Sequence, residues 1–144
     1  MHALENAFPY LDDAGRDRLL AHARQEHYPA DAVIVAEESR PAALFVLLEG
    51  RAVAAKNHLG IPIPIGEVRQ GELFGEVSFL DGSPASASVV ARESATVLVL
   101  SDVETLLRDA PELASGFYRS LAVALAQRLR FSADDRVALG FLWG

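Results

Sequence analysis

The chain carries three successive patterns of hydrophobic and polar residues. Residues 11–25 place apolar side chains at helical spacing opposite charged ones, and an Asp at position 12 or 13 can cap the first turn, so we expect a short amphipathic helix. The chain then changes to brief runs rich in β-branched residues, which glycines and a Pro-containing turn separate. These runs are residues 32–37, 42–50, 51–57, 62–68, 86–91 and 95–101. Six to eight short strands at this spacing predict a β-roll or a sandwich.

After residue 101 the pattern becomes helical again. Ser101 or Asp102 can cap a helix over residues 103–110, and Pro111 then begins a longer helix. In the longer helix apolar residues recur at every fourth position: Leu113, Phe117, Leu121, Leu125 and Leu129. This stripe either packs onto the roll or pairs two copies of the chain, and both alternatives stay open at this point. Residues 131–144 are expected to fold back onto an apolar surface.

Together these patterns predict one α+β domain over residues 1–144. Its centre is a jelly-roll-like β-roll of about eight strands over residues 30–101. An N-terminal helix precedes the roll, and C-terminal helices, one of them long, follow it over residues 102–136. A chain of 144 residues with 51% hydrophobic and 23% charged residues is long enough and apolar enough to bury a core in one domain.

The composition removes several function classes. The chain has no cysteine, so disulfides, thiolate metal sites and thiol nucleophiles are excluded. Its net charge of -7 argues against direct nucleic-acid binding, which needs a clustered basic surface. The N-terminus lacks the pattern of a signal peptide and no apolar run is long enough to cross a membrane, so we expect a cytoplasmic protein without membrane contact.

Catalytic and metal-binding patterns are missing as well. The four histidines do not have metal-ligand spacing, and no serine lies in a nucleophile motif. We therefore expect neither an enzyme nor a bound cofactor. A metal-dependent enzyme of the cupin type, which uses a similar β-roll, is the least favoured alternative.

Residues 71–89, GELFGEVSFLDGSPASASV, have a composition typical of a loop that cradles an anion, and we call this segment the cassette. Gly75 lets the backbone turn sharply, and residues 76–80 can form a short helix whose N–H groups point at a phosphate. Glu76 can accept a hydrogen bond from a hydroxyl group, while Ser86 and Ser88 can donate hydrogen bonds to a ligand.

The cassette and its flanks resemble the cyclic nucleotide-binding domain family over about residues 8–130. FVLLEGRAV is similar to the family's strand, glycine, strand hairpin, RQGELFGE to its G-x-x-F-G-E, and DGSPASASV to its P-R-x-A-T/S-V. The resemblance implies a regulatory domain whose ligand is cyclic AMP or cyclic GMP, with cyclic AMP favoured, and whose Glu76 binds the ribose 2'-hydroxyl. The implied ligand-binding residues are Phe74, Gly75, Glu76, Val77, Ser78, Pro84, Ala85, Ser86, Ala87 and Ser88. An aromatic lid over the base is implied at Tyr118, Phe141 or Trp143, which are otherwise core or interface residues.

The sequence departs from this family at the residue that contacts the phosphate. The family has an arginine where this chain has Ala85, so a charge-assisted contact worth about 1.5 to 3 kcal/mol is missing and binding should be weaker by roughly ten- to a hundredfold. Arg92 is the nearest downstream base, but at about 3.3 Å per residue the strand carries it about 20 Å from the tip of the cassette, so we expect it in solvent. At two turns that glycine marks in the family, the chain has Ala30 and Glu38.

Two functions from different classes follow from these observations. The first is a regulatory sensor without an effector domain of its own, in which a ligand shifts the following helices and an unidentified protein partner reads the shift. The second is a dimerisation or scaffold module of the same fold that binds no ligand. Ala85 favours the second hypothesis, in which Glu76 only holds its turn by hydrogen bonds to backbone amides. We also expect a homodimer through residues 113–129.

Overall fold

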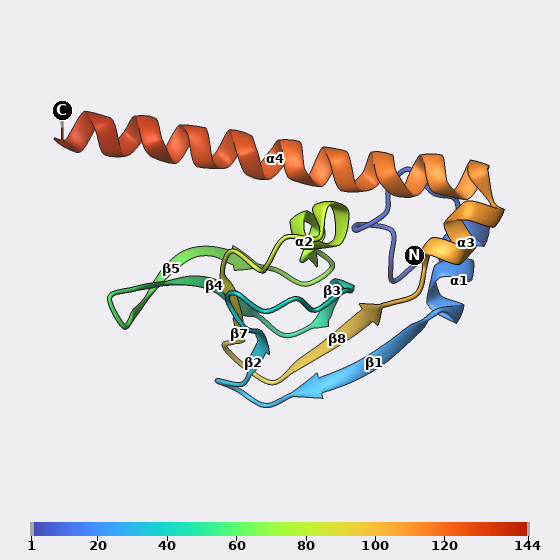
Figure 1. Cartoon of the computed structure of the whole chain (residues 1–144), viewed down its shortest axis with the longest axis horizontal. Helices are drawn as coiled ribbons and strands as arrows, with labels where there is room; N and C mark the ends of the chain where they lie inside the picture. Colours follow the sequence, from blue (N-terminus) through green and yellow to red (C-terminus); the bar gives the residue numbers. More distant parts are fainter. Residues whose placement is uncertain (1, 144) are drawn as a thin grey trace.

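The computed structural model describes the backbone of residues 2–143 and the side chains of residues 2–130. Figure 1 shows a β-roll with the long C-terminal helix running along one side of it. The helices are α1 (Asp13–Ala21), α2 (Glu76–Asp81), α3 (Glu104–Asp109) and α4 (Pro111–Trp143). The strands are β1 (Ala23–Tyr28), β2 (Val33–Val35), β3 (Leu44–Glu49), β4 (Ala52–His58), β5 (Ile61–Val68), β6 (Leu73–Phe74), β7 (Ser88–Ala91) and β8 (Ala95–Leu100). The predicted α+β class with about eight strands is confirmed.

The strands form two antiparallel sheets of four strands each. Their orders are β1-β8-β3-β6 and β2-β7-β4-β5. One apolar cluster, which includes Phe45 and Val97, fills the space between the sheets. A second cluster, which includes Leu44 and Leu98, packs the other face of the first sheet against the helices. Since neighbouring residues of β3 and β8 point to opposite faces, both strands are apolar at almost every position.

Helix α1 is shorter than predicted. Asp12 caps it as expected, because its carboxylate accepts a hydrogen bond from the Gly15 N–H at 2.8 Å. The helix ends at Ala21, however, and the end of the predicted range belongs to β1, which pairs along its whole length with β8. The prediction was wrong here because a polar edge strand and an exposed helix have similar compositions, and pairing with a distant strand decides between them. The roll therefore begins at Ala23 and not at residue 30.

The predicted caps of the next helix are also wrong. The N-cap of α3 is Val103, and no side chain caps the helix. Asp102 has a left-handed backbone, with φ at 57°, and the Ser101 hydroxyl accepts a hydrogen bond from the Arg24 guanidinium at 3.3 Å. The turn from β8 into α3 therefore occupies the residues that local sequence preference placed at the cap. Pro111 begins α4 as predicted.

Helix α4 has a packed half and a projecting half. Three residues of the predicted stripe are buried in the core of their own domain: Leu113, Phe117 and Leu121. Phe117 stacks on Phe8 with 5.3 Å between the ring centroids. Leu129, two turns after Leu121, is 70% exposed. The first half of the stripe thus packs onto the roll, Leu125 is still half-buried, and of the stripe residues Leu129 is the one that is exposed.

The end of α4 does not fold back. Figure 1 shows one helix that continues past the roll, and its last helical residue is Trp143. The expectation of a return over residues 131–144 was wrong for the described backbone, because this segment contains good helix formers and no proline to stop the helix. Within the part of the chain that the structure describes, no helix combines the length and the apolar character that a membrane span requires.

Candidate functional site

The cassette contains a turn, directly after β6, that requires glycine. Gly75 follows β6 and has φ at 80°, a left-handed conformation that L side chains rarely adopt. A Cβ atom at this position would lie 2.9 Å from Cδ2 of the Phe45 ring. This turn leads directly into α2 and places Glu76 in the first turn of that helix, as predicted.

Glu76 is a buried carboxylate that helix α4 holds in place. Its side chain is 2% exposed, and its Oε1 accepts a hydrogen bond from Nη1 of Arg128 at 2.5 Å. The second amino group of the same guanidinium donates to the carbonyl of Leu73. Oε2 of Glu76 has no hydrogen-bond partner among the described residues. The carboxylate therefore has one satisfied oxygen and one unsatisfied one, and it does not bond the backbone amides as the scaffold hypothesis expected.

Arg128 was missed in the sequence, although a signal for it exists. It lies seven residues after the buried Leu121 and so on the same face of α4. An arginine that continues an apolar stripe needs a partner on the surface that the stripe covers. Its partner, Glu76, is 52 residues away along the chain, and only the packing of α4 beside α2 brings the two together.

The other end of the cassette is held by its backbone. Ala85 is 7% exposed; its N–H donates to the Ser39 carbonyl at 2.8 Å, and its carbonyl accepts from the Glu38 N–H at 2.8 Å. The hydroxyl of Ser88 accepts a hydrogen bond from the Glu37 N–H at 2.9 Å. Ser88 thus fixes the loop before β3, whereas Ser86 is exposed.

The remaining predicted site residues lie in different environments. Phe74 is buried and stacks on Phe45 at 5.2 Å between centroids, so it belongs to the core between the sheets. Val77 is exposed, and three residues are half-buried: Ser78, Pro84 and Ala87. Arg92 is exposed beyond the end of β7, in agreement with the expectation.

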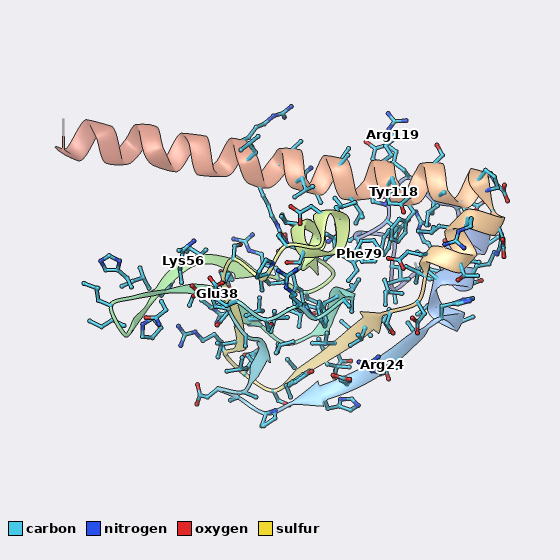
Figure 2. The ribbon with its side chains drawn as sticks, in the orientation of Figure 1. Arg24, Glu38, Lys56, Phe79, Tyr118 and Arg119 are labelled. Atoms are coloured by element: carbon cyan, nitrogen blue, oxygen red, sulfur yellow. The ribbon has the colours of Figure 1, made fainter. Side chains whose placement is uncertain are left out.

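The predicted aromatic lid is described only at Tyr118. Its ring packs edge-on against Phe117 at 5.3 Å between centroids, and its side chain remains 43% exposed. Figure 2 shows Tyr118 on α4 above Phe79 of α2. The side chains of Phe141 and Trp143 lie outside the described residues, so this part of the lid stays a prediction.

One of the two replaced glycine positions is confirmed and the other is shifted by one residue. Glu38 has a left-handed backbone with φ at 70°, as a turn position of glycine type requires. At the first turn the left-handed residue is Asp31, with φ at 72°, and not Ala30. Aspartate tolerates this conformation better than alanine because its short polar side chain can bond locally.

Two surface hollows border the hairpin of β4 and β5, but neither reaches Glu76. The larger one, about 490 Å³, is lined by residues of β2, β4, β5 and β7 and of the loops beside them, and these include Glu38 and the predicted site residue Ser88. The smaller one, about 360 Å³, is lined in part by Lys56 and Ile65, and Figure 2 shows Lys56 on the side of the hairpin nearer α4. The larger hollow therefore reaches the cassette at Ser88 but not at Glu76, and the unsatisfied buried acceptor on Glu76 is the more specific indication.

The comparison with protein families decides the family. The model of the cyclic nucleotide-binding domain matches residues 25–108, more than half of the chain. The chain belongs to the cyclic nucleotide-binding domain family. Its fold is a non-catalytic regulatory one, which removes the cupin-type enzyme as an alternative.

Individual relatives show the same likeness. The chain is 34% identical over 122 residues to the cyclic AMP receptor protein of Thermus thermophilus, covering 79% of this chain and 52% of that protein. It is 38% identical over 73 residues to a cAMP-dependent protein kinase regulatory subunit of Aspergillus niger, covering 51% of this chain and 17% of that protein. The chain thus spans about half or less of these curated relatives.

Solved structures agree. A cyclic nucleotide-binding domain from Methylobacillus flagellatus has a TM-score of 0.87 and 26% identity, with 94% of this chain and 81% of that chain covered. The catabolite activator protein of Thermus thermophilus has a TM-score of 0.78 and 32% identity, with 94% and 63% covered. This cyclic nucleotide-binding domain therefore shares its fold with these structures over 94% of the chain.

Proposed function

We propose that this cyclic nucleotide-binding domain is a sensor whose ligand is a cyclic nucleotide, with cyclic AMP the first candidate. The observation that carries the proposal is Glu76. A buried acceptor without a partner costs on the order of 1 to 3 kcal/mol, and a ligand hydroxyl that donates to Oε2 removes this cost. A ribose 2'-hydroxyl has the required chemistry, and the relatives that share this fold include a cyclic AMP receptor protein.

The same contact provides a route for a signal. Arg128 links the cassette to α4, so a ligand that engages Glu76 changes the interactions that hold this helix against α2. The projecting half of α4 then changes its position or its mobility, and a protein partner reads the change. This is a population shift between two positions of one helix, and its size is set by the difference in ligand affinity between them.

The absence of a cation at Ala85 predicts modest affinity. Asp81 adds to the unfavourable charge, because hydrogen bonds from the hydroxyl and the N–H of Ser83 lower the pKa of its carboxyl and keep it ionised. We expect a dissociation constant roughly ten- to a hundredfold above that of a cassette with an arginine at this position.

Thermal unfolding with millimolar cyclic AMP, cyclic GMP and cyclic di-GMP tests the proposal. A ligand at 100 times its Kd adds about 2.7 kcal/mol to the free energy of unfolding, which raises Tm by several degrees. We expect cyclic AMP to give this shift, Glu76→Gln to abolish most of it, and Glu93→Gln, at an exposed acid near the end of β7, to leave it unchanged. No shift with any of the three nucleotides contradicts the proposal.

A second candidate is a scaffold without a ligand, and the environment of Ala85 favours it. The side chain is buried, and both backbone groups of this residue are already paired with the loop before β3. In this case the function is assembly of a homodimer, and within the predicted range of residues 113–129 the exposed stripe residue available for it is Leu129, next to the half-buried Leu125. Light scattering that gives the monomer mass of 15.5 kDa at tens of micromolar contradicts the dimer.

A further inference from the structure

The cassette needs a positive charge that none of the residues already described supplies. The cassette carries the acids Glu76 and Asp81, and Ala85 stands where a basic residue would be needed. Arg128 is close, but its guanidinium is bound to Glu76 and to the Leu73 carbonyl. Arg92 is exposed beyond the end of β7. A cation that contacts an anionic ligand at the cassette therefore has to come from another segment.

The loop before β3 brings such a cation to the cassette. Residues 38 and 39 are joined to Ala85 by two backbone hydrogen bonds of 2.8 Å each. Two residues of this loop, Glu38 and Ala42, have left-handed backbones with φ at 70° and 52°. Conformations of this kind cost energy for residues other than glycine and persist only where surrounding contacts impose them.

Arg40 lies between these two strained residues and reaches across to the cassette. Its Nη1 donates a hydrogen bond to the carbonyl of Gly82 at 2.6 Å. The side chain is exposed, and no carboxylate forms an ion pair with it in the described part of the chain. A guanidinium has five N–H groups, so the bond to one neutral carbonyl leaves most of its donors available.

We infer that Arg40 supplies, from the loop before β3, the positive charge that contacts the anionic group of the ligand in place of the arginine missing at position 85. The inference rests on the proposed function, since it concerns the phosphate of a cyclic nucleotide bound at the cassette. The Gly82 carbonyl that Arg40 binds is three residues before Ala85, and the residue before Arg40 is hydrogen-bonded to Ala85, so the side chain is placed to exchange this carbonyl for a phosphate oxygen. A charged acceptor makes the stronger hydrogen bond of the two.

The experiment compares cyclic AMP with adenosine, which has the base and the ribose but no phosphate. Titration calorimetry is performed with the wild type, Arg40→Gln, Arg40→Lys and the control Arg92→Gln. We expect Arg40→Gln to weaken cyclic AMP binding about tenfold and adenosine binding less than twofold, because a charge-assisted contact is lost only with the phosphate. Arg40→Lys should keep most of the affinity, Arg92→Gln should keep all of it, and Ala85→Arg in the Arg40→Gln background should restore it.

Three results overturn the inference. Equal losses for cyclic AMP and adenosine indicate that Arg40 only supports the loop. Unchanged cyclic AMP binding in Arg40→Gln, while the wild type binds, removes Arg40 from the site and leaves the proposed function intact. If the wild type binds adenosine but not cyclic AMP, or binds neither, the proposed function fails together with the inference. Thermal unfolding of each variant without ligand verifies that the fold is kept.

Discussion

At one end of the cassette a carboxylate, Glu76, is buried and held by a guanidinium from helix α4, while at the other end Ala85 is buried and held only by backbone hydrogen bonds. The first end has specific chemistry, since one oxygen atom is bound and the other is left without a partner. The second end has no charged or polar side chain at Ala85, and backbone hydrogen bonds alone hold this residue in place. The comparison shows that a buried charge persists where another element compensates it, and that a position without a charge is stabilised by ordinary backbone pairing.

Of the substitutions that test the difference between the two ends, Arg128→Met is expected to have the largest effect on the free energy of unfolding. The substitution leaves the Glu76 carboxylate buried without a counter-charge, which should lower the free energy of unfolding by about 2 to 3 kcal/mol, less than for a fully buried pair because Arg128 is 43% exposed. Urea denaturation measures the change. Arg130→Met, at an exposed arginine of the same helix, is the matched control, and an equal loss in both variants contradicts the role of the pair. Adding Glu76→Gln to Arg128→Met should recover most of the loss, since the unpaired charge is then gone.

A smaller effect is expected at the turn that positions Glu76. Gly75→Ala should cost about 2 kcal/mol, because alanine is disfavoured at φ 80° and its Cβ meets the Phe45 ring. Gly82→Ala is a close control: it has φ at 72° but no atom within 4 Å of the added Cβ, so only the conformational cost of about 1 kcal/mol remains. Thermal or urea unfolding of the two variants separates the conformational cost of a left-handed alanine from the cost of the contact with Phe45. Equal losses of unfolding free energy in the two variants would contradict a cost from Phe45, because the ring would then have moved away from the added Cβ atom.

Ala85→Arg introduces at the second end of the cassette the arginine that the family has at this position. We expect binding of cyclic AMP to become about tenfold tighter or more, since a charge-assisted contact to the phosphate is added. Titration calorimetry measures the dissociation constant, and Leu80→Arg, at an exposed residue of α2 in the same cassette, is the control for unspecific attraction. Binding in the variant together with none in the wild type supports the scaffold hypothesis instead.

The smallest effect on stability is expected where α4 projects from the domain. Leu129→Ser should change the free energy of unfolding of a dilute sample by no more than about 0.5 kcal/mol, because this side chain is 70% exposed. In a dimer through the projecting half, the same substitution shifts the mass measured by light scattering toward 15.5 kDa. A stability loss of the size typical of a buried leucine, about 2 to 5 kcal/mol, would show that the residue packs on its own domain after all.

Local sequence patterns predicted much of the roll and the start of the cassette. The turn at Gly75, the short helix α2 and the cap at Asp12 depend on residues next to one another, and their preferences are visible in a single sequence. β1 was missed because its residues fit two structures and only the distant β8 selects one of them. The sequence placed the first left-handed turn at Ala30, whereas the structure has it at Asp31. A sequence pattern alone does not fix the position of a turn to within one residue, because tertiary contacts decide it.

The candidate site likewise has features that the sequence shows and contacts that only the tertiary structure shows. The identity of its family and the replacement at Ala85 depend on which residues stand in a short motif, and such a motif can be recognised without coordinates. The partners of these residues lie far away along the chain: Arg128 for Glu76, Glu37 for Ser88, and Arg40 for the Gly82 carbonyl. Only tertiary structure decides such pairs, because no local preference of the backbone or of a side chain depends on a residue that packing alone brings near.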